Sequence, residues 1–172
     1  MNEILPFLYL GGLTDAENVA ALETAGICAI VTCCTYQECP KYAEKREFEY
    51  FRVDIEDTSR EPLHLYFQEA GQFIDRHVSR QQAVLVHCKA GVSRSASIVL
   101  SYLMGCKNFA LQEAFFHVLT KRGCICPNIG FMEQLCAYER EVRDSCSVCM
   151  FKYTDWYTAD CSYRPAIPDL EP

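Results

Sequence analysis

The residues best suited to do chemistry lie in one short stretch, residues 84–95. An apolar, β-branched run ends at His87, and Cys88 follows it directly. A loop of five mostly small residues separates Cys88 from Arg94, and an apolar segment typical of a buried helix continues from Ser95. A strand, a tight loop and a helix in this order direct backbone N–H groups and the positive end of a helix toward one anion. In such a place the cysteine would act as a thiolate nucleophile, and Arg94 would offer a planar fork to two phosphate oxygens.

The pattern His-Cys-x5-Arg-Ser resembles the signature loop of the cysteine-dependent protein tyrosine phosphatase superfamily. Its Ala-Gly-x-Ser-Arg-Ser ending is similar to the dual-specificity branch in particular, and the resemblance spans residues 2–145. The resemblance implies that Ser95 stabilises the departing thiolate and that the loop binds phosphate through Lys89, Ala90, Gly91, Val92, Ser93 and Arg94. The alternative is a buried structural cysteine in a turn.

Length, composition and charge narrow the class of protein. A chain of 172 residues that is half apolar predicts one globular domain with a real core. The formal net charge of −7 argues against a nucleic-acid partner and against attraction to anionic membranes. No apolar run approaches the length of a membrane span, and residue 2 is Asn, which excludes N-myristoylation there.

The chain contains twelve cysteines, most of them in apolar segments rather than in a framework of turns. No signal peptide precedes them, so we expect free thiols in a reducing compartment, the cytoplasm and also the nucleus. Cys146-x-x-Cys149 has only Cys161 downstream, and no histidine follows His117. Four zinc ligands are therefore not at hand, and we expect no metal.

Strands and helices alternate early in the chain, and helices accumulate late. This order predicts an α/β fold with a mostly parallel central sheet of about four to five strands flanked by helices, which the resemblance makes protein tyrosine phosphatase-like. The catalytic domain should span 1–145, and 146–172 should form a loosely ordered extension. Periodicity and turn signals predict strands at 4–10, 27–32, 48–55 and 83–87, and helices at 14–25, 62–79, 110–121 and from about 128.

A thiolate that attacks phosphorus needs a proton donor for the leaving oxygen, and Asp57 is placed to be that acid. If the strands at 48–55 and 83–87 are parallel, Asp57 and Cys88 lie at the same edge of the sheet. In the resembling family the acid precedes a helix that contains Tyr-Phe, as Asp57 does here. Asp54 and Glu56 are the alternative candidates for the general acid. We expect Asp54 to lie inside the strand as a structural carboxylate.

Other positions near the loop invite supporting roles. His87 should orient the loop and stabilise the thiolate through hydrogen bonds. Asn128 matches a family asparagine that tethers the loop backbone, although a plain helix N-cap is the alternative. Arg122 could lie at the pocket mouth or at a solvated helix end. Cys33 or Cys34 could form a reversible disulfide with the nucleophile, or both could be buried small apolar residues.

The expected activity is hydrolysis of phosphotyrosine and phosphoserine or phosphothreonine through a phosphocysteine intermediate, without a cofactor. The expected partner is a phosphoprotein, with signalling kinases among the candidates. Because the sequence begins at the catalytic domain, we expect a small, atypical member of the branch. Lipid-directed relatives tend to carry a second loop lysine, where this chain has only Lys89. A phosphoinositide or another non-protein phosphomonoester is therefore the weaker alternative, and a phosphate-binding pseudophosphatase scaffold is the contrasting one.

Overall fold

The computed structural model describes residues 1–39, 48–159 and 168–171. Within them a five-stranded sheet has the order β1-β2-β5-β3-β4. The strands are β1 (Asn2–Leu5), β2 (Leu8–Gly11), β3 (Ile27–Thr32), β4 (Glu49–Arg52) and β5 (Ala83–His87). Only β1 runs antiparallel to its neighbour, so the prediction of a mostly parallel sheet is confirmed.

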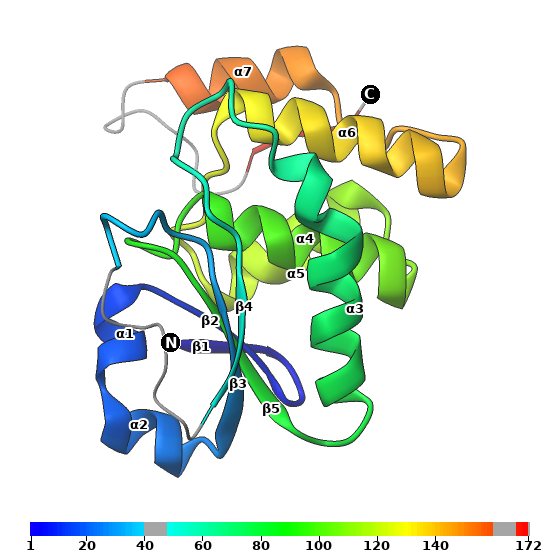
Figure 1. Ribbon diagram of the computed structural model, residues 1–172. Coiled ribbons are helices and arrows are strands. Elements are labelled where there is room, and N and C mark those ends of the chain that lie inside the picture. The colour runs from blue at the N-terminus through cyan, green and yellow to red at the C-terminus, as the bar shows by residue number, and fades with distance from the viewer. Residues whose placement is uncertain (40–47, 160–167, 172) are drawn as a thin grey trace.

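Helices cover both faces of this sheet (Figure 1). The short helices α1 (Leu13–Glu17) and α2 (Val19–Thr24) lie on one face, and the longer helices lie on the other. These are α3 (Phe67–Val78), α4 (Arg94–Lys107), α5 (Leu111–Lys121) and α6 (Ile129–Arg143), and the 3-10 turn η1 (Leu63–Tyr66) leads into α3. Helix α4 is buried over its first eleven residues, because it packs between the sheet and the other helices.

The predicted strands at 27–32 and 83–87 are confirmed at both ends. The single strand predicted at 4–10 is instead a hairpin of β1 and β2, because Phe7 turns the chain with a φ of 68°. The single helix predicted at 14–25 is split at Asn18, whose side chain accepts a hydrogen bond from the Ala21 N–H and caps α2. The strand predicted at 48–55 is shorter, since β4 ends at Arg52.

The C-terminal extension contains a packed helix, α7 (Met150–Thr158), which differs from the loose segment expected there. Tyr153 and Trp156 are buried on this helix, and both rings meet Phe115 of α5 edge-on at centroid distances of 5.9 and 6.0 Å. The extension is therefore attached to the domain by an aromatic cluster, which burial of large ring surfaces stabilises.

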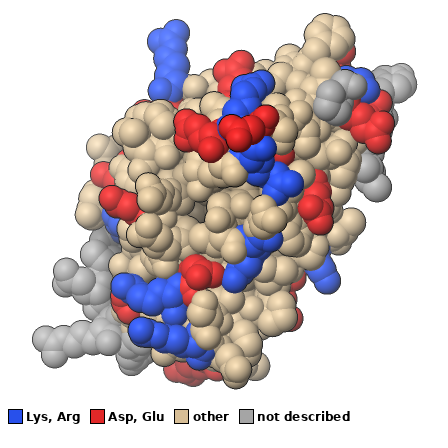
Figure 2. All heavy atoms as spheres, turned by 90° about the vertical axis from the view of Figure 1, so that its right-hand side faces the viewer, with Lys and Arg blue, Asp and Glu red and all other residues tan. Residues whose placement is uncertain are grey.

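The surface of the molecule carries charges of both signs. Figure 2, which shows the α3 side of the molecule, has acidic and basic side chains intermingled rather than gathered into areas of one sign. Among the helices of the described residues, none has the length and apolar character needed to cross a bilayer.

Candidate active site

The carboxyl ends of β3, β4 and β5 meet at one edge of the sheet, since these strands are parallel. Cys88 follows β5 and Asp57 lies beyond the end of β4, so the prediction that they share this edge is confirmed. The last residues of β3 and β5, Thr32 and His87, are register partners. The predicted chemical groups therefore converge on one place in the fold.

The sulfur of Cys88 is buried and accepts two hydrogen bonds. The backbone N–H of Gly91 and the hydroxyl of Ser95 both lie 3.2 Å from Sγ. Both groups donate to the sulfur and hold it at the base of the loop. The position of Ser95 agrees with the role that the family resemblance implies for it.

The loop between Cys88 and Arg94 has its carbonyl groups turned outward. All five carbonyl oxygens of residues 89–93 accept hydrogen bonds from other parts of the chain. The donors are Leu13 N–H, the Arg122 guanidinium (twice), Cys126 N–H and Ser97, at 2.7–3.0 Å. In a trans peptide the carbonyl and the following N–H point in opposite directions. The N–H groups of residues 90–94 therefore point inward, where they form a cradle for an anion.

Gly91 allows this loop to fold so tightly. Its φ of 70° lies in the left-handed region, and a Cβ added there would collide with the Gly11 backbone and with Arg122. A side chain at this position would force apart β2 and the loop, so glycine is required by both conformation and space.

Arg94 begins α4 and is held from two sides. Its Nη1 donates to Glu38 Oε2 at 2.5 Å and to the Ile55 carbonyl at 3.1 Å, and its Nη2 donates to Glu38 Oε1 at 3.1 Å. Burial alone would lower the pKa of Arg94, but the bonds to Glu38 and the nearby Cys88 raise it above its usual value. Of the five guanidinium N–H donors, these bonds leave Nε–H and one Nη2–H, which lie on one edge of the fork and match two phosphate oxygens.

Asp57 stands at the mouth of the cradle. Its Oδ1 accepts hydrogen bonds from the Ser93 hydroxyl at 2.7 Å and from Asn128 Nδ2 at 2.9 Å. Its Oδ2 lies 3.7 Å from Arg94 Nε, so the carboxylate faces the guanidinium. Asp54 and Glu56 are exposed, and Asp54 lies beyond the end of β4 rather than inside the strand where it was expected.

Asn128 is the helix N-cap that the sequence suggested as one alternative, and it bonds to the Ser93 side chain rather than to the loop backbone. Its side-chain oxygen accepts the Phe131 N–H at 3.0 Å and caps α6, while its Nδ2 holds Asp57. Its backbone N–H donates to the Ser93 hydroxyl at 3.0 Å, which ties α6 to the loop. The tether therefore runs through Ser93, whose hydroxyl bonds to the acid and to Asn128 together.

His87 is fully buried beneath the loop, and this burial lowers its pKa to about 4. The ring is therefore neutral near pH 7. Its Nδ1 lies 3.3 Å from the Cys88 carbonyl oxygen and must donate to it, so Nε2 accepts from the Thr32 hydroxyl 3.0 Å away. This geometry orients the start of the loop, as predicted. Stabilisation of the thiolate by His87 stays a prediction.

Glu38 could not be recognised from the sequence, because it lies in a polar stretch before Pro40 and meets Arg94 only in the folded chain. Arg122 is the C-cap residue at the end of α5, and it is half-buried there. Its guanidinium sits behind the loop, where it bonds to the Ala90 and Gly91 carbonyls and to Asn2 Oδ1. It is thus a positioning residue for the cradle.

Two further cysteines lie near the nucleophile. Cys33 and Cys34 directly follow β3 and are buried, and this burial, together with the smaller effect of nearby Cys88, raises the pKa of each thiol. Cys161, the third cysteine considered for zinc, lies outside the described residues. Within those residues, no group of three or more His, Cys, Asp or Glu side chains could hold a metal ion.

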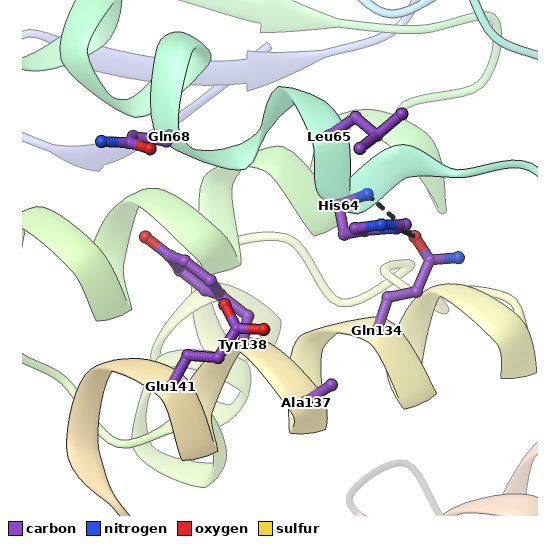
Figure 3. Close-up of a pocket in the computed structure, with 7 residues that line it drawn as sticks. All are labelled: His64, Leu65, Gln68, Gln134, Ala137, Tyr138 and Glu141. Atoms are coloured by element: carbon purple, nitrogen blue, oxygen red, sulfur yellow. Dashed lines mark hydrogen bonds between the residues drawn. The ribbon is translucent and has the colours of Figure 1, made fainter.

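A separate pocket of about 380 Å³ lies between η1 and α6 (Figure 3). Its walls include His64, whose N–H bonds to Gln134, and the ring of Tyr138. The loop that follows Cys88 contributes none of the residues that line it. We therefore place the active site at the sheet edge and not in this pocket.

Comparison with known proteins agrees with this assignment. Residues 8–141 match the family model described as dual specificity phosphatase, catalytic domain. The chain belongs to the dual specificity phosphatase family. Cys88, Arg94 and Asp57 all lie within the matched residues.

Full-length relatives show the same family. The chain is 42% identical over 146 residues to dual specificity protein phosphatase 1-A of Xenopus laevis, covering 84% of this chain and 39% of that protein. It is 41% identical over 140 residues to dual specificity protein phosphatase 2 of Homo sapiens, covering 81% and 44%. The chain thus spans about two fifths of the length of these curated dual specificity phosphatases.

Solved structures of the family share the fold. The human tyrosine phosphatase-like serine/threonine/tyrosine-interacting protein superposes with a TM-score of 0.78 at 36% identity, over 82% of this chain and 96% of that one. Human DUSP28 superposes with a TM-score of 0.76 at 30% identity, over 83% and 94%. The protein tyrosine phosphatase-like architecture predicted for this dual specificity phosphatase is therefore confirmed.

Proposed function

We propose that this protein is a protein phosphatase that hydrolyses phosphotyrosine and phosphoserine or phosphothreonine through a phosphocysteine intermediate. One observation carries the proposal. A buried sulfur with two hydrogen-bond donors lies at the base of a loop whose N–H groups converge, beside an arginine edge with two uncommitted donors. This arrangement suits a phosphoryl group attacked by a thiolate.

The proposed reaction has two displacements. In the first, the Cys88 thiolate forms a bond to phosphorus as the bond from phosphorus to the leaving oxygen breaks, and Asp57 gives its proton to that oxygen. In the second, water attacks the phosphocysteine, Asp57 takes a proton from the water, and the sulfur leaves as a thiolate. The inward N–H groups and Arg94 stabilise the charge on the three equatorial oxygens in both steps. Ser95 donates to the sulfur as it departs.

The substrate class and compartment follow from the family and the composition. Homologous dual specificity protein phosphatases support a phosphoprotein substrate, and signalling kinases are candidates within that class. The cysteines of the described residues are free thiols, which supports a reducing compartment such as the cytoplasm or nucleus.

Two observations define the competing proposals. One similar structure is named as an interacting protein, which raises a binding role without catalysis as an alternative. Against it, this chain keeps the Cys88 sulfur bonded to the Ser95 hydroxyl and an acid, Asp57, 3.7 Å from Arg94. Phosphoinositide hydrolysis is less favoured because the loop carries a single lysine, Lys89.

The test is hydrolysis of a chromogenic aryl phosphate in the presence of a chelator. The parent protein should turn it over, and Cys88→Ser should abolish turnover while still binding phosphopeptide. Cys106→Ser is the matched control, because Cys106 is an exposed thiol on α4 and its loss should leave the rate unchanged. A parent protein that binds phosphopeptide without turnover would support the scaffold alternative instead.

A further inference from the structure

The helix of the C-terminal extension reaches the active site. Helix α7 lies outside residues 8–141, which match the family model. Its Tyr153 hydroxyl donates to the Pro127 carbonyl at 2.6 Å, directly before the Asn128 that holds Asp57. The backbone of the extension is fixed as well, since the Cys149 N–H donates to the Leu170 carbonyl at 2.9 Å. Helix α7 is thus anchored at the segment that positions the acid.

This anchoring places Tyr157 at a cavity beside the phosphate-binding loop. The cavity has a volume of about 410 Å³, and its lining residues are Asp57, Val92, Ser93, Cys126, Asn128 and Tyr157. Three of them belong to the proposed acid and to the loop itself. Tyr157 is half-buried, and its ring lies 6.2 Å from that of Tyr153, so the position of its ring is supported by the buried aromatic cluster.

The cavity is therefore continuous with the catalytic site, and we propose that it is a specificity subsite that binds an apolar or aromatic side chain next to the phosphorylated residue of the substrate. Tyr157, Val92 and Cys126 offer apolar or aromatic surface to such a side chain. The inference rests on the proposed function in that the occupant is part of a phosphoprotein substrate.

The charge around Asp57 favours the same kind of occupant. On its other side Asp57 lines a second pocket, of about 370 Å³, together with Glu38 and Glu56. An acidic side chain of a substrate is repelled by the exposed carboxylate of Glu56, whereas an apolar side chain meets Tyr157 without that penalty. The subsite therefore selects for apolar flanking residues and against acidic ones.

The experiment uses two series of phosphotyrosine peptides. In one series the residue before the phosphotyrosine is Phe, Ala or Glu, and in the other series the residue after it is varied in the same way. In one of the two positions, the parent protein should hydrolyse the Phe peptide with a kcat/KM about tenfold above that of the Ala peptide, the size of effect that apolar side chains have in a fitted pocket. Tyr157→Ala should reduce this ratio to within about twofold, because the ring that forms the pocket wall is lost. Tyr157→Phe should keep the ratio.

Phe151→Ala is the matched control, because Phe151 is an exposed aromatic residue on the same helix and does not line the cavity. The ratio of kcat/KM between the Phe and Ala peptides should be the same for Phe151→Ala as for the parent protein. Tyr157→Lys guards against simple loss of α7, because a folded variant with a lysine here should prefer the Glu peptide to the Phe peptide, a gain that unfolding cannot produce. Ratios taken on one variant also cancel any effect of the substitution on Asp57.

A parent protein without the preference, or a preference that survives Tyr157→Ala, would overturn the subsite and leave the proposed phosphatase activity standing. Dissociation constants of the same peptides, measured by fluorescence anisotropy with Cys88→Ser, should show the same order. If the parent protein hydrolyses neither aryl phosphate nor peptide, the proposed function fails, and the order of the dissociation constants still decides whether the subsite exists.

Discussion

The carboxylate of Glu38 holds the end of the Arg94 guanidinium through bonds to both terminal nitrogens. Glu38 is on the segment after β3, and Arg94 is at the start of α4, 56 positions later in the chain. The bond lowers the pKa of Glu38, so the carboxylate stays charged near pH 7. The guanidinium is fixed at its far end and presents its side edge, Nε and Nη2, for substrate.

We predict that Glu38→Ala lowers kcat/KM for an aryl phosphate about tenfold. A charged hydrogen bond of this kind contributes about 1.5–3 kcal/mol, and part of this free energy keeps Arg94 in the orientation that binds phosphate. Glu56→Ala is the control, because Glu56 lines the same pocket but has no bond to Arg94, and its kcat/KM should stay within about twofold of the parent value. An increase in kcat/KM for Glu38→Ala would show instead that Glu38 competes with phosphate.

We predict that Asn128→Ser lowers kcat for a phosphoserine peptide, about tenfold, while leaving the stability near that of the parent. Serine keeps the helix cap but lacks the Nδ2 donor that holds Asp57. Asn128→Ala should show the same loss of kcat and in addition lose about 1 kcal/mol of stability with the cap. The measurements are steady-state kinetics and denaturant unfolding. Parent-like kcat in Asn128→Ser would remove Asn128 from the positioning of the acid.

The parts of the site that follow from local order in the sequence were predictable. Cys88, the loop and Arg94 occupy consecutive positions, and β3 and β5 were located to the residue by their apolar runs. Asp57 could be placed at the edge of Cys88 because parallel strands bring their carboxyl ends together, and its choice over Asp54 and Glu56 rested on the family resemblance. Glu38 could not, because its bond to Arg94 joins two segments whose approach depends on the complete fold.

The fold of the C-terminal extension also could not be predicted from local sequence. The inner face of helix α7 is stabilised by contacts of Tyr153 and Trp156 with Phe115, which lies on a helix distant in the sequence. The position of Tyr157 beside Asp57 depends on those contacts. Local periodicity carries no information on them, so the segment was expected to be loose.

We predict that the protein loses stability as the pH falls from about 6.5 to about 4, and that His87 contributes to this loss. In the folded state burial lowers the pKa of His87 from 6.5 to about 4. Below pH 6.5 the unfolded chain therefore takes up a proton at this residue that the folded chain does not, and the difference amounts to roughly 3 kcal/mol when the whole window has been crossed. Urea unfolding of the parent and of His87→Gln at pH 7.5, 6 and 4.5 checks this. The variant should lose less stability over that range, and equal losses would contradict the assignment.

We predict that mild peroxide links Cys88 to Cys33 or Cys34. Peroxide oxidises the Cys88 thiolate to a sulfenic acid, and a neighbouring thiol then forms the disulfide with release of water. Burial raises the pKa of Cys33 well above its usual value and that of Cys34 to about 12, so the second step should be slow at pH 7 and faster at pH 9.

Peptide mass spectrometry of the parent, Cys33→Ser and Cys34→Ser would identify the partner, with Cys106→Ser as a surface control. The linkage should disappear in one of the two β3 variants and should be reversed by a thiol reductant. Accumulation of sulfinic acid at Cys88 without any such linkage would mean that Cys33 and Cys34 are packing residues only.

The five outward carbonyls make the anion site dependent on the tertiary structure. Their donors come from segments as far apart as Leu13 and Cys126. A synthetic peptide with the sequence of residues 84–95 has none of these donors, so it would not form the anion site by itself. Oxyanion affinity is thus a reporter of the intact tertiary structure, and the cost of ordering the amides has been met during folding, before any ligand arrives.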